Sequence, residues 1–371
     1  MSFKNVFSLS VIVLLSACVF TGCSSSEDGP TPPPHEEEVS GLYILNEGSY
    51  EMNNSTLSLF SQPEGNPGVV VPDIFENNNG RKLGDTGHDF VVYGSKMYVA
   101  VYGSGTIEVT DLSGKSIKQI KTDNTGANIQ PRYLTTHSGK VYVTLFDGFL
   151  ARLDTTSLAI EAKIAVGRNP ENVVVANNKL YVANSGGMDY NTAIGYDKTV
   201  SVVDIASFSE TKKIEVVINP SNMVTDSEGD VYLVSLGNYT PEAPNTLQKI
   251  DSQTDEVSSI EIANATEMAS VGDKIYMIYS QYDEDIRSQT ITYYVYDAIT
   301  ETVITENFIS DGTVVAFPYK ISADAVSGNV YITNSDYVNN GDIYEFSSAG
   351  KLLNKFEVGI GPRKVVAGKL Q

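Results

Sequence analysis

The chain has very little cysteine: two of its 371 residues, Cys18 and Cys23, both near the N-terminus. The remaining sequence has no thiol, which excludes disulfide bonds, thiolate zinc sites and cysteine nucleophiles from its folded part. Tryptophan is absent, and histidine occurs only at His35, His88 and His137. A histidine metal site or a quinoprotein mechanism would need more ligands than these, so we expect neither.

Positive charge is also scarce, with 25 Lys and Arg against 46 Asp and Glu and a formal net charge of −21. Binding of nucleic acid needs a basic stripe, so this balance argues against such a partner. The same acidity repels an anionic membrane surface, so membrane attachment would have to be covalent or through a partner. The 41% of hydrophobic residues is enough for a globular core and excludes a disordered chain.

Motifs for phosphate or calcium binding are missing as well. The stretch from Gly80 to Gly84 lacks the Gly-Lys-Ser/Thr ending of a phosphate-binding loop. The acidic run Asp283–Asp285, and Asp336 with Asp342, lack the spacing of a calcium loop, and solvated acidic loops explain them more simply. We therefore predict no metal, no catalytic cofactor and no catalytic residues.

The one long apolar run, Val6 to Leu15, follows Lys4 and is too short for a membrane-spanning helix. Small residues and the two cysteines come after it, which resembles a bacterial lipoprotein signal. Leu15–Cys18 matches the lipobox better, but a polar segment directly follows Cys23. We expect a signal peptide over 1–22, lipidation of Cys23 (alternatively Cys18), a disordered tether over 23–40, and an outer-membrane protein facing outward. An ordinary cleaved signal is the other interpretation.

A short pattern recurs along the rest of the chain: a small turn, then Lys or Asp, an apolar residue, a tyrosine and further strand formers. Its tyrosines are 39 to 55 residues apart, at Tyr43, Tyr98, Tyr142, Tyr181, Tyr232, Tyr276 and Tyr331. Alternating and β-branched residues dominate each unit, and no window shows a helical stripe. Seven repeats of this length are typical of a repeat fold rather than of separate domains.

Each unit contains four strand-like segments, so the sequence predicts an all-β fold, a seven-bladed β-propeller of four-stranded antiparallel blades over residues 41–371. The first unit starts at a second strand, Gly41–Leu45, while the chain ends with a spare first strand, Lys364–Gly368. Pairing the C-terminal strand with the N-terminal blade would close the ring and remove an open sheet edge. Alternation alone would also fit a β-sandwich.

The repeat resembles the YVTN type of propeller repeat, as in Tyr181–Asn184 and Tyr331–Asn334. Residues 41–371 as a whole resemble BtuG-type surface lipoproteins that bind cobalamin. The matching segments are Leu42–Gly48, Asn77–Asp85, Thr106–Leu112, Gln130–Tyr133 and Lys179–Gly187. The resemblance implies high-affinity binding of cobalamin or related corrinoids as a ligand, not as a catalytic cofactor, and transfer to an outer-membrane TonB-dependent transporter.

Long loops between second and third strands, and the loops before first strands, should meet on one face of a propeller, where function concentrates. Tyrosine, asparagine and serine in these loops form an adaptable binding surface, although each also suits an ordinary turn. The expected ligand-binding residues are Tyr50, His88, Asp89, Tyr102, Arg132, Arg168, Asn172, Tyr190, Asn222, Tyr239, Glu267, Tyr282, Lys320, Tyr337 and Arg363. Two alternatives remain: a propeller lyase using His88 with Glu267, and a protein-docking scaffold on the cell surface.

Overall fold

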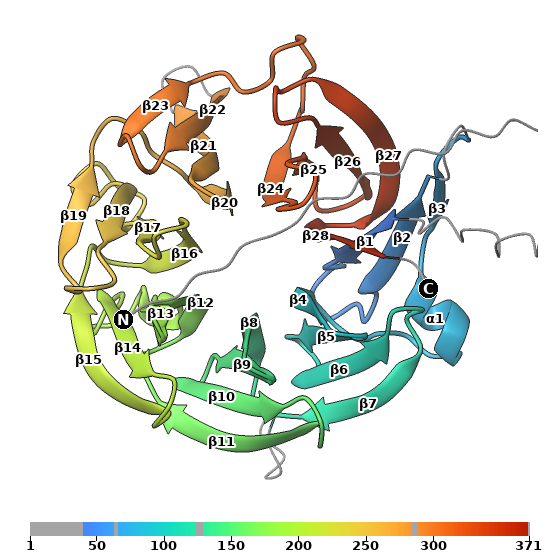
Figure 1. The fold of residues 1–371 in the computed structure, drawn as a ribbon, viewed down its shortest axis with the longest axis horizontal. Coiled ribbons are helices and arrows are strands. Elements are labelled where there is room, and N and C mark those ends of the chain that lie inside the picture. Colours follow the sequence, from blue (N-terminus) through green and yellow to red (C-terminus); the bar gives the residue numbers. More distant parts are fainter. Residues whose placement is uncertain (1–39, 63–65, 123–128, 284–287, 370–371) are drawn as a thin grey trace, which may run out of the picture. The chain divides into compact units, whose positions relative to one another are not determined.

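The computed structural model describes residues 40–62, 66–122, 129–283 and 288–369. These residues form seven four-stranded antiparallel sheets arranged as blades around a central axis (Figure 1). The prediction of an all-β, seven-bladed propeller is thereby confirmed. The expected signal peptide, both cysteines and the expected tether up to residue 39 lie outside the described residues.

Blades 1 to 4 contain sixteen of the strands, and each blade runs from an innermost strand at the axis to an outermost one. Blade 1 consists of β28 (Pro362–Lys369), β1 (Ser40–Asn46), β2 (Thr56–Ser61) and β3 (Val69–Val71). Blade 2 consists of β4 (Gly87–Tyr93), β5 (Lys96–Val101), β6 (Thr106–Asp111) and β7 (Ser116–Lys121). Blade 3 consists of β8 (Pro131–His137), β9 (Lys140–Leu145), β10 (Phe149–Asp154) and β11 (Ala159–Ala165). Blade 4 consists of β12 (Pro170–Ala176), β13 (Lys179–Asn184), β14 (Thr199–Asp204) and β15 (Ser209–Glu215).

Blades 5 to 7 follow the same order. Blade 5 consists of β16 (Pro220–Thr225), β17 (Val231–Ser235), β18 (Thr246–Ile250) and β19 (Val257–Ile260). Blade 6 consists of β20 (Glu267–Val271), β21 (Lys274–Asp283), β22 (Ser288–Asp297) and β23 (Thr302–Thr305). Blade 7 consists of β24 (Pro318–Ala323), β25 (Val330–Asn334), β26 (Asn340–Phe346) and β27 (Leu352–Ile360).

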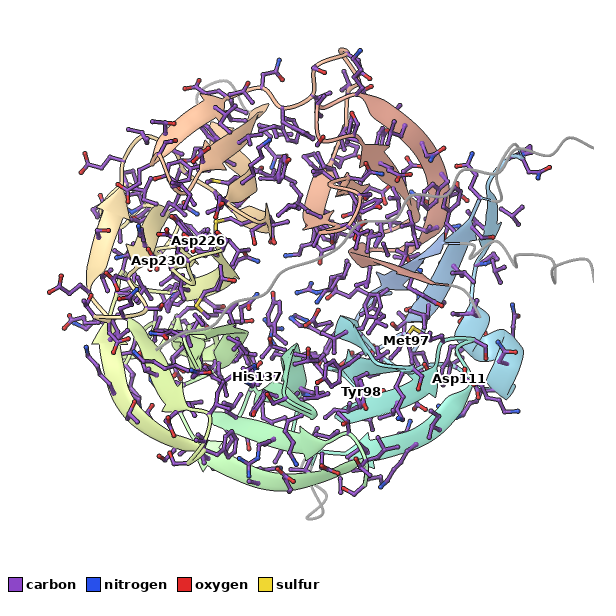
Figure 2. The ribbon with its side chains drawn as sticks, viewed as in Figure 1. Met97, Tyr98, Asp111, His137, Asp226 and Asp230 are labelled. Carbon is purple, nitrogen blue, oxygen red and sulfur yellow. The ribbon has the colours of Figure 1, made fainter. Side chains whose placement is uncertain are left out.

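The repeat tyrosines explain why the pattern recurs, because all seven lie on second strands and are at most 2% exposed. Adjacent residues of a strand point to opposite faces of the blade, so each second strand packs against two neighbouring blades. On β5, Met97 belongs to the core shared with blade 1, and Tyr98 to the core shared with blade 3 (Figure 2). The hydrophobic core therefore lies between the blades, as a series of interfaces around the ring.

The ring closes as the sequence predicts. Strand β28 pairs antiparallel with β1, with Tyr43 opposite Val366 and Ile44 opposite Val365. The C-terminal segment thus supplies the innermost strand of the blade that contains the N-terminal strands. Both strands gain partners along edges that would otherwise offer unpaired N–H and C=O groups to other chains.

The two faces of the propeller differ in their loops. On one face, first and second strands are joined by two-residue turns, such as Gly94–Ser95 and Asn177–Asn178. On the other face the connections between second and third strands are longer in blades 1, 4 and 5. We call this second side the loop face. In blade 6 the second and third strands are longer than in the other blades, because β21 and β22 extend to ten residues each.

Helix is limited to two short segments among the described residues, α1 (Ile74–Asn79) and the 3₁₀ turn η1 (Gly187–Asp189). No window of the sequence shows a helical stripe, and α1 is too short to produce one. It forms because the Asp73 side chain accepts hydrogen bonds from the backbone N–H groups of Phe75 and Glu76, and Gly80 ends it in the left-handed conformation. Within the described ranges, no helix is long and apolar enough to cross a membrane.

Candidate functional site

Six of the seven innermost strands begin with an irregularity in strand pairing. In β8 the paired residues jump from Pro131 to Leu134, and in β12 they jump from Pro170 to Val173. β16 and β24 have the same irregularity, and β4 and β28 have a smaller one. A bulge of this kind leaves its residues free of regular pairing and redirects their side chains. The residues at and just after these irregularities therefore place polar side chains around the central axis.

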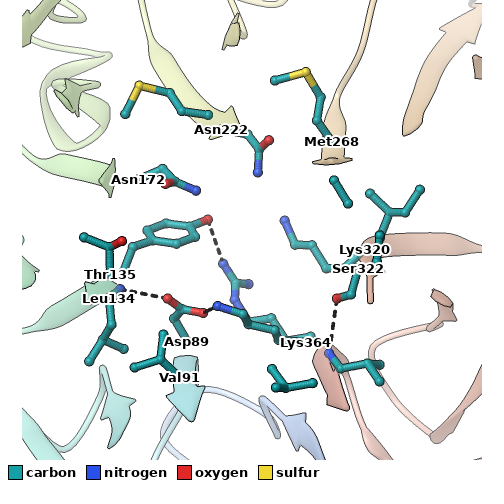
Figure 3. A pocket seen from close by; sticks show the side chains of 18 of the residues that line it. Asp89, Val91, Leu134, Thr135, Asn172, Asn222, Met268, Lys320, Ser322 and Lys364 are labelled. Carbon is teal, nitrogen blue, oxygen red and sulfur yellow. Dashed lines mark hydrogen bonds and ion pairs between the residues drawn. The ribbon is translucent and has the colours of Figure 1, made fainter. Parts of the chain in front are cut away.

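A cavity of about 450 Å³ runs along the first strands inside the ring (Figure 3). Seven of the expected binding residues line it: His88, Asp89, Asn172, Asn222, Glu267, Lys320 and Arg363. The cavity continues past apolar and small polar residues such as Val91, Thr135 and Ser322. The structure thus brings residues from all seven blades together around one space.

Arg363, at the start of β28, lies at the loop-face end of this cavity, which we call its mouth, and 9% of its side chain is exposed. Its Nε donates to the carbonyl oxygen of His88 at 2.6 Å, and its Nη2 lies 2.9 Å from Nε2 of the His88 ring. Its Nη1 donates to the Tyr319 hydroxyl at 2.8 Å and to Oε2 of Glu47 at 3.1 Å. The guanidinium group is held on several sides and has little freedom to move.

Glu47 and Tyr319 complete this cluster. The Tyr319 hydroxyl donates to Oε2 of Glu47 at 2.5 Å, which makes it both an acceptor from Arg363 and a donor to the carboxylate. Burial disfavours the charged form of Glu47, but the charge of Arg363 and the bond from Tyr319 outweigh it and lower the pKa of Glu47. Burial raises the pKa of Tyr319, so its hydroxyl keeps its proton. Glu47 and Arg363 therefore form a charged pair whose side chains are largely shielded from solvent.

Arg132 is fixed on the opposite side of His88. Its Nε donates to Oε2 of Glu171 at 3.0 Å, and a second guanidinium nitrogen donates to the same oxygen. The guanidinium carbon lies 5.1 Å from the centre of the Tyr102 ring and 4.6 Å from that of Phe146. An arginine held by one carboxylate and two aromatic rings is a rigid hydrogen-bond donor in a partly apolar environment.

His88 lies between the two guanidinium groups and is 3% exposed. Burial lowers the pKa of His88 well below its usual value, and the positive charges of Arg132, Arg363, Lys320 and Lys364 lower it further. The neutral ring has one acceptor nitrogen, and the 2.9 Å contact from Arg363 assigns it to Nε2. Nδ1 lies 3.4 Å from Nη1 of Arg132.

Two further ion pairs lie along the cavity. The Lys320 ammonium group donates to Glu267, and Lys364 donates to Oδ1 of Asp89 at 2.6 Å. Asp89 Oδ2 also accepts from the backbone N–H of Leu134 at 2.8 Å. Each of the cations Arg363, Lys320 and Lys364 thus has a carboxylate partner, whereas Asp324, farther along the lining, accepts hydrogen bonds from Val326 and Ser327 in its own turn.

Exposed tyrosines stand on the loops of the same face. Tyr50 is 62% exposed, Tyr190 63%, Tyr239 73% and Tyr337 63%. Tyr337 meets the Tyr319 ring edge-on, with ring centres 5.1 Å apart. This contact joins the exposed tyrosines to the cluster at the mouth. The side chain of Tyr282, which the sequence also indicated, lies outside the described residues.

Arg168 does not join the cavity. Its Nη1 donates to Asp189 and to the carbonyl oxygen of Gly195 at 3.0 Å, and its Nε lies 3.5 Å from Asp197. These partners belong to the connection between β13 and β14, which also carries Tyr190. Arg168 therefore fixes the shape of a loop that presents an exposed tyrosine.

Sequence reasoning did not single out Glu47, Tyr319, Glu171 or Phe146, although each contacts an expected site residue. One signal was available for two of them. Glu171 and Tyr319 come directly after Pro170 and Pro318, the position that Arg132 and Arg363 occupy in their own blades. A comparison of the residues that follow the first-strand prolines would have selected them.

The acidic residues considered for calcium do not form a site within the described ranges. Residues 284 and 285 lie outside them. Asp336 accepts from the backbone N–H groups of Val338 and Asn339 in its own turn, and Asp342 pairs with Lys355 at 3.2 Å. In the part of the chain that the structure describes, no three His, Cys, Asp or Glu residues are grouped to hold a metal ion.

Comparison with known proteins gives a family and a fold. The model of a family described as "Domain of unknown function (DUF5074)" matches residues 40–358. No curated protein matches the chain. A structure of hydrazine synthase from Kuenenia stuttgartiensis has a TM-score of 0.59 at 12% identity, covering 76% of this chain and 95% of that one.

Two other solved structures are similar in the same way. A quinoprotein alcohol dehydrogenase-like protein from Bacteroides thetaiotaomicron has a TM-score of 0.56 at 16% identity, covering 90% of this chain and 92% of that one. The WD40 propeller domain of Doa1 has a TM-score of 0.54 at 11% identity, covering 81% and 90%. At these identities the likeness shows the propeller fold alone.

Proposed function

This chain belongs to the DUF5074 family, and we propose that it is a binding protein that takes a corrinoid such as cobalamin on its loop face. One observation carries the proposal: exposed tyrosines, including Tyr190, Tyr239 and Tyr337, stand on the loops above a rigid, charge-balanced cavity mouth. A wide, flat and polar ligand is the kind of molecule that such a surface fits.

The physical properties of this face support a large ligand with many hydrogen-bonding groups. Tyrosine rings provide flat contact area at low cost in conformational entropy, and their hydroxyl groups add hydrogen bonds. At the mouth, Arg132 and Arg363 are donors that carboxylates and His88 already hold in place. Preorganised groups of this kind raise affinity because little order has to be created on binding. The resemblance to BtuG-type lipoproteins supports a corrinoid as the ligand.

We further propose that the protein is a lipoprotein, anchored through Cys23 to the outer membrane and facing outward, and that it passes its ligand to a TonB-dependent transporter. The lipobox-like segments and the polar residues after Cys23 support this location. We propose no enzymatic step. The placement of both ring nitrogens of His88 beside guanidinium groups favours a positioning role for His88 over that of a general base.

The proposal is tested by calorimetric titration of the full chain in detergent with cobalamin. Combining Tyr190→Ala, Tyr239→Ala and Tyr337→Ala should weaken binding by several kcal/mol, since aromatic anchors of a binding face often contribute about 2 kcal/mol or more each. The melting temperature should stay nearly unchanged, because these side chains are 63% to 73% exposed.

The control is His137→Ala at the opposite end of the first strand β8, which should leave affinity unchanged. Intact affinity in the triple variant would show that the face is wrong. If no corrinoid binds and the tyrosine face captures a protein instead, the chain is a docking scaffold. Turnover of a small molecule that His88→Ala abolishes would establish the lyase alternative.

The anchor is tested separately by metabolic labelling with a fatty acid in cells. Cys23→Ser should abolish labelling, because it removes the thiol that accepts the lipid, and Cys18→Ser should leave labelling intact. The reverse result assigns the lipid to Cys18. Labelling of neither the parent nor either variant contradicts a lipid anchor.

A further inference from the structure

Two asparagines lie at equivalent places in neighbouring blades, two residues after the proline that begins the first strand. Asn172 is on β12 and Asn222 is on β16, and both line the cavity. Figure 3 shows the two amides pointing into the open space, with no hydrogen bond drawn from either of them to another of the displayed residues. Oδ1 of Asn222 is buried and has no hydrogen-bond partner within the described ranges.

An unpaired amide oxygen in this position is costly for folding alone. Leaving a buried polar atom without a partner costs roughly 1–3 kcal/mol, and a leucine, whose side chain branches at the same carbon, would avoid that cost. The cations that line the cavity are already paired with carboxylates: Lys320 with Glu267, Lys364 with Asp89, and Arg363 with Glu47. These charged groups are therefore occupied, whereas Oδ1 of Asn222 keeps an unmet hydrogen bond, so the asparagine pair offers a ligand amide groups that no charged neighbour uses.

The charge balance decides what kind of group the pair can accept. A carboxylate entering the cavity would be desolvated and would have to compete for a cation that already holds a carboxylate. An ammonium group would meet the corresponding difficulty. A primary carboxamide is uncharged and offers both donors and an acceptor, which match the donors and acceptor of each asparagine amide.

We propose that Asn172 and Asn222 form a subsite that admits one uncharged carboxamide arm of the ligand and discriminates against the corresponding carboxylate. This inference rests on the proposed corrinoid function, because it concerns the specificity of that same site. The exposed tyrosines hold the body of the ligand, and the asparagine pair selects the arm that reaches into the ring.

The test compares two ligands and two proteins. The ligands are cobalamin and derivatives in which a single side-chain carboxamide is hydrolysed to a carboxylic acid. The proteins are the full chain in detergent and its Asn172→Leu/Asn222→Leu variant. For one position on the ligand, we expect the unmodified protein to prefer the amide by about tenfold or more, a difference of ~1.4 kcal/mol. The variant should lose most of that preference by binding the parent ligand more weakly.

The matched control is Gln253→Leu, which changes an exposed amide in the turn between β18 and β19 on the opposite face and should leave both affinities unchanged. The melting temperature gives an independent readout, because Asn222→Leu removes an unpaired buried oxygen and should not lower it. A marked fall in melting temperature would make Asn222 a structural residue and overturn the subsite.

The outcomes separate this inference from the function on which it rests. Binding of cobalamin with an amide preference that the asparagine substitutions leave unchanged overturns the subsite only. Equal binding of cobalamin and every acid derivative does the same. Absence of binding by any corrinoid overturns the proposed function and the subsite together.

Discussion

His88 shows how a single side chain organises the mouth of the cavity. Its buried ring separates two guanidinium groups, accepting from Arg363 at 2.9 Å and lying 3.4 Å from Arg132. A protonated ring at this position would add a third positive charge to the same small volume. Burial, followed by the charges of these arginines and of Lys320 and Lys364, keeps its pKa well below the usual value of 6.5. The neutral ring therefore helps to hold the two arginines apart in a fixed geometry.

This depressed pKa predicts a loss of stability on mild acidification. Above about pH 6.5 the imidazole is neutral in the folded and unfolded states and adds no pH dependence. Below that pH the unfolded chain binds a proton that the folded protein excludes, so the free energy of unfolding falls as the pH falls. Between pH 7.5 and 5.5 this loss should be about 1.4 kcal/mol by linkage.

Urea unfolding of the wild type and of His88→Gln at the two pH values measures the effect. The glutamine oxygen still accepts from Arg363 but does not titrate, so the variant should lack the His88 contribution. The lowered pKa of Glu47 affects stability only at lower pH, near and below its ordinary value of 4.5. Equal pH dependence of both proteins would contradict a neutral, buried His88.

At the scale of single elements, an asparagine at the end of the second strand connects the parts of a blade. Asn184, at the end of β13, is fully buried and donates to Thr199 Oγ1 and Ser201 Oγ on β14, each at 3.0 Å. Its Oδ1 accepts from the backbone N–H of Gly167 at 3.0 Å, in the segment that enters the blade. Asn46 makes the same donations to Thr56 and Ser58 in blade 1. The asparagine that ends the YVTN-like pattern is thus a structural residue.

Asn184→Ala should lower the free energy of unfolding by about 2 kcal/mol or more. The substitution leaves the buried N–H of Gly167 and the two hydroxyl groups without this partner, and unpaired buried groups cost roughly 1–3 kcal/mol. Chemical denaturation measures the change, and the exposed Asn191→Ala in the following loop serves as the control. A loss no larger than that of the control would contradict the structural role.

At the scale of the whole molecule, stability depends on closing the ring. β28 contributes a strand to blade 1 and also borders blade 7, where Val365 is 4% exposed within a core that includes Tyr331 and Ile343. Blades pack through their neighbours, so an open ring would expose apolar surface on both sides of the gap. The C-terminal strand therefore holds the first blade and the last blade of the chain together.

Val365→Ala should reduce the free energy of unfolding by about 2 kcal/mol, because it removes two buried methyl groups. Val326→Ala is the matched control, since Val326 is 96% exposed and should lose almost nothing. Deleting residues 362–371 should have a far larger effect and lower the melting temperature strongly. A truncated chain that melts cooperatively at the full-length temperature would contradict closure by β28.

Much of the fold could be predicted from the sequence because its signals are local and repeated. The second strands are buried on both sides, so each has an apolar centre, and each carries the tyrosine that packs between blades. The spare first strand, Lys364–Gly368, also indicates which strand it pairs with. The first unit lacks a first strand, and each of the seven blades needs one. The short helix α1 was not predicted because its sequence signal is the N-cap residue Asp73, and the helix is too short to show helical periodicity.

The sequence by itself determined the all-β class, the number of blades, the way the ring closes and the strands that face its axis. Only the tertiary structure decided which polar residues meet. Glu47 and Arg363 are 316 positions apart, yet they form an ion pair, whereas Arg168 turns away from the axis to Asp189 and Asp197. The strand patterns follow from periodic burial, which is visible in the sequence of each short segment. The partners of a charged side chain depend on how seven blades are rotated around one axis, and no local pattern records that arrangement.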